Sequence, residues 1–185
     1  MSETIEIVPY NALWPEEYRE IAAQLSNALG DYALAIDHIG STSVPGLSAK
    51  DVIDVQVTVD SLDLPLEPLL VPLGYRPAKH LVDHRPPGRE DLPAEELEKH
   101  FYSRPHRRVN LHIRVSGRFN QRYALLCRDY LRTHPLAARA YAEIKQQLSR
   151  YFPDNADAYY DIKDPVFDLI MEGAYEWKQR LAASS

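Results

Sequence analysis

The stretch from Asp37 to Val57, DHIGSTSVPGLSAKDVIDVQV, constrains the fold more than any other part of the chain. It predicts a strand that ends in a Gly-Ser turn, a loop punctuated by Pro45 and Gly46, and a second strand that opens with Asp54. Gly40 can adopt the backbone angles of a tight turn, and its lack of a side chain lets a bulky anion approach the backbone. Three hydroxyls follow beside free N–H groups, in a concavity that suits anions; they belong to Ser41, Thr42 and Ser43.

Two segments alternate between apolar and polar residues, as strands with one buried and one wet face do. In the first, Val55, Val57 and Val59 alternate with Asp54, Gln56 and Thr58. In the second, Val109, Leu111, Ile113 and Val115 alternate with Asn110, His112, Arg114 and Ser116. We therefore predict that polar residues of both strands line one continuous face of a sheet: Asp54, Gln56, Asn110, His112 and Arg114.

The other segments of the first two thirds of the chain give weaker signals. An amphipathic helix is expected from Pro15 to Gly30, followed by a strand over 32–39 and a short helix within 61–73. Further strands are expected over 5–8, 75–81 and 100–103. Residues 82–98 contain several prolines and charges and predict a mobile surface loop, with one helical turn at 94–97.

Three helices are expected to finish the chain. Asn120 is the predicted N-cap of the first, Pro135 opens the second, and Asp164 and Pro165 start the last. Strands first and helices last, without strict alternation, predict an α+β fold in which a small mixed sheet carries a C-terminal helical bundle.

Charge and composition limit the partners. The formal net charge of −6 disfavours broad nucleic-acid binding, although arginines cluster between Arg104 and Arg122, as either a solvated edge or a local phosphate-attracting patch. No apolar run is long enough to span a bilayer, and the polar start is unlike a signal peptide, so we expect a cytoplasmic protein without a membrane partner. The single cysteine, Cys127, lies in an apolar stripe and is expected to be a buried structural thiol.

The motifs HIGSTSVPGL, AK and VIDV resemble the signature of the GrpB (UPF0157) family, a branch of the nucleotidyltransferase superfamily. Further matches lie in NLHIRV, NQRYALLCRDYLRTHPLAARAYAEIKQQL and YYDIKDPVF, so the likeness runs from about Ile5 to about Trp177. The resemblance implies a nucleotidyltransferase-like mixed β-sheet flanked by helices. We expect a core over 1–118 and a helical segment over 119–185 packed on it, in one compact domain.

In the wider superfamily the Gly-Ser turn grips a triphosphate, and paired carboxylates on the next strand hold Mg²⁺. Here Asp54 takes the first carboxylate position and Gln56 the second, and the strand expected to carry a third acid has none. Asp54 is therefore the one predicted metal ligand. Mg²⁺ is expected to bind weakly until ligand phosphates complete its shell, and Gln56→Asp is expected to raise the metal affinity.

The resemblance and the polar face together suggest further site residues. Asp54 and His112 are the catalytic candidates, because a histidine exchanges a proton near neutral pH. The candidates for ligand or phosphate binding are Gly40, Ser41, Thr42, Ser43, Gln56, Asn110, Arg114, Arg122 and Lys163; Arg122 and Lys163 are equally readable as surface or helix-packing cations. His38 is expected to orient the turn. Asp37 and Asp51 are weaker candidates, and Asp51 is expected to point away from Asp54.

Three functions remain open from the sequence. The first is a protein that binds a nucleotide or a phosphorylated small molecule and transfers a nucleotidyl group. The alternative is a non-catalytic nucleotide-binding or regulatory domain that kept the turn and has a degenerate metal site. A third reading is an adaptor that uses its helical face. The position of Gln56 and the absent third acid favour the non-catalytic domain.

Overall fold

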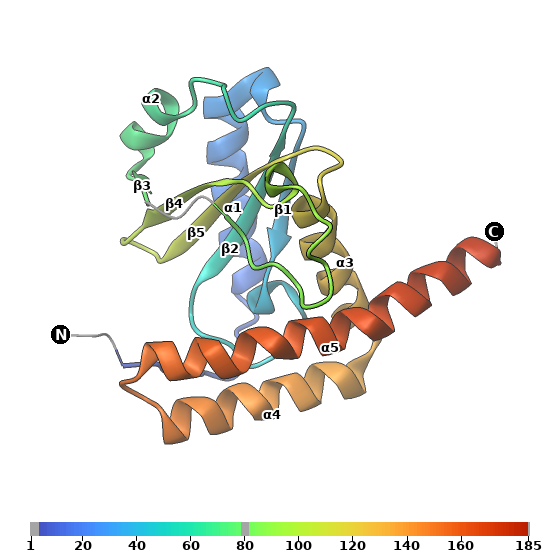
Figure 1. Cartoon of the computed structure of the whole chain (residues 1–185). Coiled ribbons are helices and arrows are strands. Elements are labelled where there is room, and N and C mark those ends of the chain that lie inside the picture. The colour runs from blue at the N-terminus through green and yellow to red at the C-terminus, as the bar shows by residue number, and fades with distance from the viewer. Residues whose placement is uncertain (1–3, 79–81, 185) are drawn as a thin grey trace.

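A computed structural model describes residues 4–78 and 82–184 of the chain as a mixed five-stranded sheet with helices packed around it (Figure 1). The strands are β1 (Ala35–Ile39), β2 (Ile53–Val59), β3 (Arg76–Pro77), β4 (His100–Arg104) and β5 (Val109–Val115). Their order across the sheet is β1-β2-β5-β4-β3. The central pair, β2 and β5, is parallel, and the other neighbours are antiparallel. The predicted α+β class is confirmed.

The helices are α1 (Trp14–Leu29), α2 (Glu67–Leu70), α3 (Phe119–Thr133), α4 (Pro135–Tyr151) and α5 (Ala156–Ala183). Pro15 lies in the first turn of α1 and Pro135 begins α4, where a missing N–H costs nothing. Short 3-10 turns complete the described chain at Gly30–Tyr32, Ser41–Ser43, Val71–Leu73 and Ala94–Glu96. Among the described residues, no helix is both long and apolar enough to cross a bilayer.

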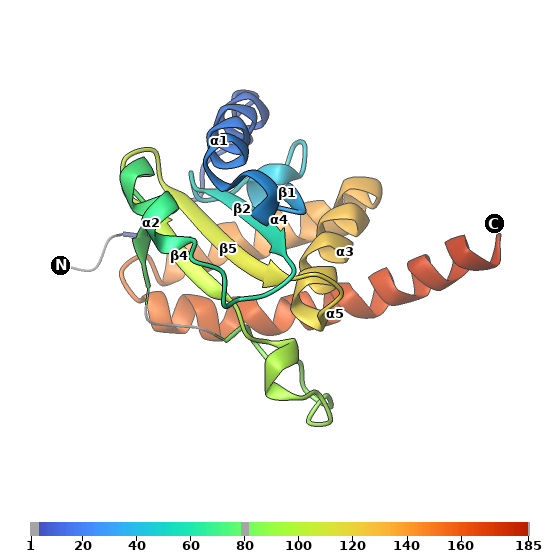
Figure 2. The ribbon, with the colours of Figure 1, turned by 90° about the horizontal axis from the view of Figure 1, so that it is seen from above.

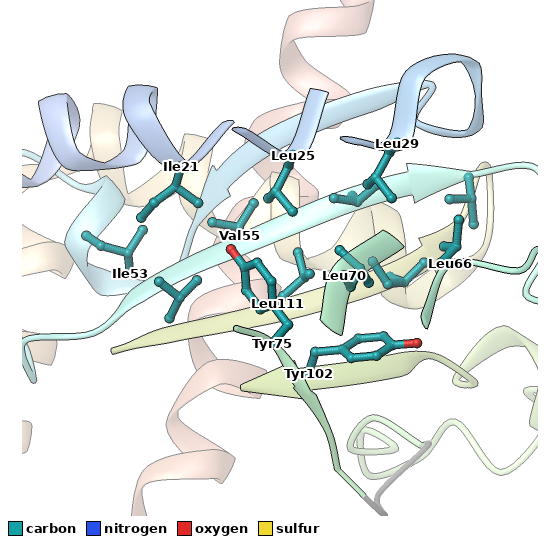
Figure 3. Close-up of a cluster of buried hydrophobic side chains, with 14 of the residues drawn as sticks. Ile21, Leu25, Leu29, Ile53, Val55, Leu66, Leu70, Tyr75, Tyr102 and Leu111 are labelled. Atoms are coloured by element: carbon teal, nitrogen blue, oxygen red, sulfur yellow. The ribbon is translucent and has the colours of Figure 1, made fainter. Parts of the chain in front are cut away.

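One face of the sheet is apolar and is covered by α1 and α2 (Figures 2 and 3). Leu25 of α1 and Leu70 of α2 pack with Val55 and Leu111, and all four are essentially inaccessible to water. Burying each such side chain contributes roughly 1.5–3 kcal/mol. The apolar positions of β2 and β5 belong to this cluster, as their alternation predicts: Ile53, Val55, Val57, Val59, Val109, Leu111 and Ile113.

A second apolar cluster joins the loop after the Gly-Ser turn to the three C-terminal helices. Val44 and Leu47 of the loop pack with Cys127 of α3 and Met171 of α5. Cys127 is buried, and burial raises the pKa of its thiol to about 12, so the thiol is structural as expected. Figure 1 shows α4 and α5 side by side beneath the sheet, where they close the polar face.

The predicted starts of two helices are wrong. Asn155 caps α5 by accepting a hydrogen bond from the N–H of Ala158 at 3.0 Å, so Pro165 lies inside the helix and not at its start. The helix continues through the proline because buried residues of α5 anchor it before and after that position, Tyr159 on the N-terminal side and Met171 on the C-terminal side. Asn120 is not the N-cap of α3, because the helix begins at Phe119 and the Asn120 side chain is used elsewhere.

Three predicted strands differ from their expected bounds. Residues 5–8 contribute only an isolated bridge between Val8 and Ala49. The strand expected over 75–81 is observed as the two-residue β3, and residues 79–81 lie outside the described part of the chain. The strand expected over 32–39 starts later, at Ala35, because a 3-10 turn precedes it.

Candidate functional site

A cavity of about 560 Å³ lies between the polar face of the sheet and the C-terminal helices. Its wall combines the Gly-Ser turn, the polar ends of β2 and β5, and side chains of α3, α4 and α5. Of the predicted site residues, it contains Gly40, Ser41, Thr42, Asp54, Asn110, His112, Arg114 and Lys163. The volume falls within the range of small-molecule sites, which runs from roughly 300 to 1,000 Å³.

The floor of the cavity is the polar face of β2 and β5. Their parallel register sets Asp54 beside Asn110 and Gln56 beside His112. The Asn110 side-chain amide donates to Asp54 Oδ1 at 2.9 Å, and His112 Nε2 lies 3.8 Å from the same oxygen. The predicted shared face is therefore confirmed, because Asp54 and His112 are neighbours on it.

Gly40 has a different reason for being glycine than the sequence suggested. Its φ is +69°, in the region that favours glycine. A Cβ placed on it would lie 2.4 Å from Asp54 Oδ2. The space beside the Gly40 α-carbon therefore holds the Asp54 carboxylate, not the anion of a ligand, and the turn and the acid are fitted to each other.

The three hydroxyls after Gly40 do three different things. Ser43 donates to the Gly40 carbonyl at 2.6 Å and lies outside the cavity wall, which corrects its predicted role in anion binding. Thr42 donates to the Val52 carbonyl at 3.1 Å and so fastens the turn to β2. Only the Ser41 hydroxyl meets a cation, because it accepts a hydrogen bond from Lys145 Nζ at 2.9 Å.

His38 orients the turn, as expected. Its Nε2 lies 3.0 Å from the Thr42 hydroxyl, and its ring stacks on Tyr18 with centroids 4.6 Å apart. Burial lowers the pKa of His38 to about 4, so the ring is neutral near pH 7.

Lys145 is one of the site residues that sequence reasoning missed. Its side chain projects from α4 into the cavity wall and the residue is only 3 % exposed. Besides Ser41, Nζ donates to the Ser48 carbonyl at 2.5 Å, and it lies 4.6 Å above the Tyr141 ring. Within residues 4–78 and 82–184 it forms no ion pair. Burial, with a contribution from Lys163, lowers its pKa to about 7.

A signal for Lys145 does exist in the sequence. The buried positions of α4 are Ala138, Tyr141, Lys145 and Leu148, so the lysine stands on the apolar stripe of an amphipathic helix. A lysine is almost never fully buried without a partner or a function. Its place on the stripe could therefore have marked it.

Gln56 is a structural residue. It is fully buried and outside the cavity wall, its Oε1 accepts from Arg114 Nη1 at 2.7 Å, and its Nε2 donates to the Gln121 carbonyl at 3.3 Å. This corrects its predicted role as a ligand-binding residue. An aspartate at position 56 would face the Arg114 guanidinium rather than a metal, so the expected gain in metal affinity loses its basis.

Asp83 is an acid of the cavity wall that comes from a loop and not from a strand. It comes from the segment 82–98, which the sequence indicated only as a surface loop. Arg114 donates to it from Nε at 2.8 Å and from Nη2 at 3.0 Å, Lys99 forms an ion pair with it, and Asn120 donates at 3.1 Å. Burial raises the pKa of Asp83, but the two cations outweigh burial and hold the pKa well below its usual range.

His112 and Asp54 have fixed protonation states near neutral pH. Lys99 Nζ and Arg114 Nη2 each lie 3.4 Å from His112 Nδ1, and both groups can only donate. Nδ1 is therefore the acceptor, and the ring proton is on Nε2, toward Asp54. Burial and then Arg114 lower the pKa of His112 to about 4. Burial raises the pKa of Asp54, but hydrogen bonds from His112 and Asn110 outweigh it and lower the pKa overall.

The donor set does not fit a resident metal ion. Across the described ranges, no three histidine, cysteine, aspartate or glutamate side chains are grouped so that they could share one. Asp83 is neutralised by Lys99 and Arg114, and Asp164 pairs with Lys163 at 2.7 Å. Mg²⁺ prefers an octahedral shell of oxygens, and Asp54 alone provides too few of them.

The remaining candidates divide between wall and surface. Lys163 lies inside α5, lines the cavity and sits 4.4 Å above the Phe167 ring. Arg122 is exposed and outside the wall, which corrects its predicted role. Asp37 pairs with Arg128 at 3.1 Å, and Asp51 pairs with Arg107 at 2.9 Å, away from the cavity as expected.

Comparison with known protein families matches residues 4–173 to the family described as GrpB protein. The chain belongs to the GrpB family. A GrpB protein from Enterococcus faecalis has been solved; it is 29 % identical, has a TM-score of 0.76, and the match covers 94 % of this chain and 99 % of that one. This likeness confirms the GrpB fold for the described sheet and helices.

Curated relatives of this GrpB chain carry two kinds of name. A dephospho-CoA kinase of Mycobacterium tuberculosis is 38 % identical over 92 % of this chain and 46 % of its own length. A UPF0157 protein of Pseudomonas aeruginosa is 33 % identical over 91 % of this chain and 67 % of its own length. The chain thus spans about half the length of the dephospho-CoA kinases it matches.

Proposed function

We propose that the cavity binds a nucleotide or another phosphorylated small molecule, with a phosphate beside Ser41 and Lys145. The observation that carries this proposal is Lys145 itself. A buried ammonium group costs folding free energy unless an anion compensates it. Lys145 has two neutral oxygens as partners, a depressed pKa and a position in the cavity wall beside the Gly-Ser turn. A phosphate at the turn supplies the missing charge.

The charge of the whole cavity supports an anionic ligand. In a chain of net charge −6, the described residues that line this cavity include six lysines and arginines but only three aspartates. The cations are Lys50, Lys99, Arg114, Arg128, Lys145 and Lys163, and the acids are Asp54, Asp83 and Asp164. Lys50 resembles Lys145 in forming no ion pair within the described residues; it donates to the Tyr160 hydroxyl. Such an excess draws anions inward.

The cavity also has room for a ring. Its wall contains the aromatic side chains of Phe101, Phe119, Tyr123, Tyr141, Tyr159, Tyr160 and Phe167. Planar ligand groups pack well on such rings, and a wall that is mostly apolar with a few polar groups is typical of small-molecule sites. A nucleotide combines the two features, a phosphate and a planar base.

The names of the relatives suggest which nucleotides to test first. Several longer relatives are called dephospho-CoA kinases, and this chain matches about half of each. The printed sequence contains no G-x-x-x-x-G-K-[ST] loop, which P-loop kinases use to cradle the phosphates of ATP. We therefore include coenzyme-A precursors among the candidate ligands and assign no kinase reaction to this chain.

Binding without nucleotidyl transfer is the function that the geometry supports better. Transfer would require acids to hold Mg²⁺ around the reacting phosphate. Gln56 is engaged by Arg114, and Asp83 is neutralised by two cations. Nucleotidyl transfer is the second candidate, and the ionised Asp54 beside a neutral His112 favours it. If transfer occurs, the Asp54 carboxylate accepts the proton of the attacking hydroxyl.

A thermal-shift screen tests the binding proposal. Nucleotides and coenzyme-A precursors are added with and without Mg²⁺, because a ligand specific for the folded state raises stability by mass action. We expect at least one phosphorylated compound to raise Tm in wild type and in Lys178→Gln, a matched variant at an exposed lysine of α5, but not in Lys145→Gln. Equal Tm shifts in all three proteins would show that Lys145 does not bind the phosphate.

A further inference from the structure

A second cationic group lies in the same cavity, beside His112. It consists of Lys99 on β4 and Arg114 on β5, both largely buried. Arg114 presents Nε and Nη2 to the two oxygens of the Asp83 carboxylate. This two-pronged contact is also the way in which arginine binds a phosphate or a ligand carboxylate.

A continuous line of contacts connects the two cationic groups. Ser41, which meets Lys145, is adjacent in sequence to Gly40, and Gly40 packs directly on the Asp54 carboxylate. Asp54 is next to His112 Nε2, and His112 Nδ1 is 3.4 Å from both Lys99 Nζ and Arg114 Nη2. The Asp54–His112 pair therefore lies between two sets of cations within one cavity.

Resting on the proposed function, we propose that the ligand of this cavity carries two anionic groups, one bound at Ser41 and Lys145 and the other at Lys99 and Arg114. In the free protein the Asp83 carboxylate occupies the second position. A ligand whose second anion takes over Lys99 and Arg114 displaces Asp83, and its middle portion then faces Asp54 and His112.

The charge balance of the second subsite supports this assignment. Asp83 supplies one negative charge to two cations, so the subsite keeps a net positive charge even when Asp83 is bound. A phosphate monoester or a bisphosphonate end carries more than one negative charge near neutral pH, and it matches two cations better than one carboxylate does. Asp83 comes from a loop between β3 and β4, whereas Lys99 and Arg114 stand on strands of the sheet. The carboxylate is therefore the partner that can leave while the cations stay in place.

Calorimetric titration with synthetic phosphonates tests the two-anion ligand. The probes are alkane α,ω-bisphosphonates with spacers of increasing length, and alkyl monophosphonates of matched length. We expect one spacer to bind wild type about tenfold or more tightly than its monophosphonate, because the second contact is made within one complex. Lys99→Gln is expected to remove this advantage, so that the bisphosphonate binds the variant no more tightly than the matched monophosphonate does.

Asp83→Asn provides an independent test. Loss of the competing carboxylate charge is expected to raise the affinity for the best bisphosphonate several-fold, whereas Asp91→Asn, at an exposed acid of the same loop, leaves it unchanged. If Asp83→Asn does not fold, the Lys99→Gln comparison decides alone. Measurable monophosphonate binding with no bisphosphonate advantage at any spacer overturns the second subsite and leaves the proposed function standing. Absence of binding by every probe overturns both.

Discussion

Lys145 of α4 donates a hydrogen bond to the Ser41 hydroxyl at 2.9 Å, although 104 residues separate them in the chain. The contact joins the Gly-Ser turn to the C-terminal helices and leaves a buried ammonium group without a carboxylate partner in the described structure. Charge buried in this way lowers stability unless an opposite charge compensates it. The pair therefore links the architecture of the GrpB fold to a binding site for an anion.

The depressed pKa of Lys145 predicts a pH-dependent stability. Its folded-state pKa is about 7, below the ordinary value of about 10.4, so between these values the unfolded state binds more protons. Wild-type stability should therefore rise relative to Lys145→Met as the pH increases from about 7 to about 10, by at most ~1.4 kcal/mol per pH unit. Urea unfolding of both proteins over this range measures the gap, and parallel curves would contradict the assignment.

Asp83 predicts a pH dependence of the same sign, stability rising with pH, but in the acidic range. Its folded-state pKa is depressed, so its stabilising contribution is present above the unfolded value of about 4 and is lost as the pH falls further. The stability advantage of wild type over Asp83→Asn should be largest near neutral pH and should shrink below about pH 4. Urea unfolding at a series of acidic pH values tests this; an advantage that is constant down to the lowest folded pH argues against the Asp83–Arg114–Lys99 cluster.

Gly40 should be the least replaceable glycine of the turn region. Gly40→Ala adds a Cβ at 2.4 Å from Asp54 Oδ2 and also strains a backbone with φ of +69°. Gly46 has a similar φ of +78°, but a Cβ there meets no atom within 4 Å. We expect Gly46→Ala to cost about 1 kcal/mol of unfolding free energy from the backbone alone, and Gly40→Ala about 2–4 kcal/mol. Urea denaturation compares them, and equal costs would mean that Asp54 does not pack on Gly40.

Metal affinity should be low and should not respond to Gln56. Calorimetric titration of Mg²⁺ into the protein without nucleotide is expected to show no tight binding, because Asp54 is the one acid among the described wall residues without a lysine or arginine in an ion pair. Gln56→Asp is expected to behave like wild type, since the new carboxylate faces Arg114. Tight binding in wild type, or a clear gain in the variant, would show that another donor set holds the ion.

The sequence predicts much of the frame of this molecule. The alternation of apolar and polar residues identifies β2 and β5 and the face that Asp54 shares with His112, because a strand has a side-chain period of two. Pro15 and Pro135 mark helix starts, because proline fits the first helical turn. Gly40 and Ser41 mark the turn. These signals come from neighbouring residues, and the structures that they predict depend mainly on local backbone geometry.

The parts of the site that the sequence did not indicate depend on contacts between distant segments. Asp83 becomes a buried acid only because Arg114 and Lys99 reach it across β4 and β5. Gln56 becomes structural only because its strand neighbour in the sheet brings Arg114 against it. Asn120 reads as an N-cap, yet it serves the Asp83 cluster instead. Pairing between strands and the path of a long loop decide these roles, and neither is encoded by a pattern of neighbouring residues in the sequence.

The most direct test of the phosphate site is calorimetric titration of inorganic tripolyphosphate into wild type, Lys145→Gln and the control Lys178→Gln. A charged hydrogen bond contributes about 1.5–3 kcal/mol, so Lys145→Gln should bind about tenfold or more weakly than wild type, whereas Lys178→Gln should match it. Circular dichroism establishes that all three proteins are folded. The account is contradicted if wild type and Lys145→Gln bind tripolyphosphate with the same Kd.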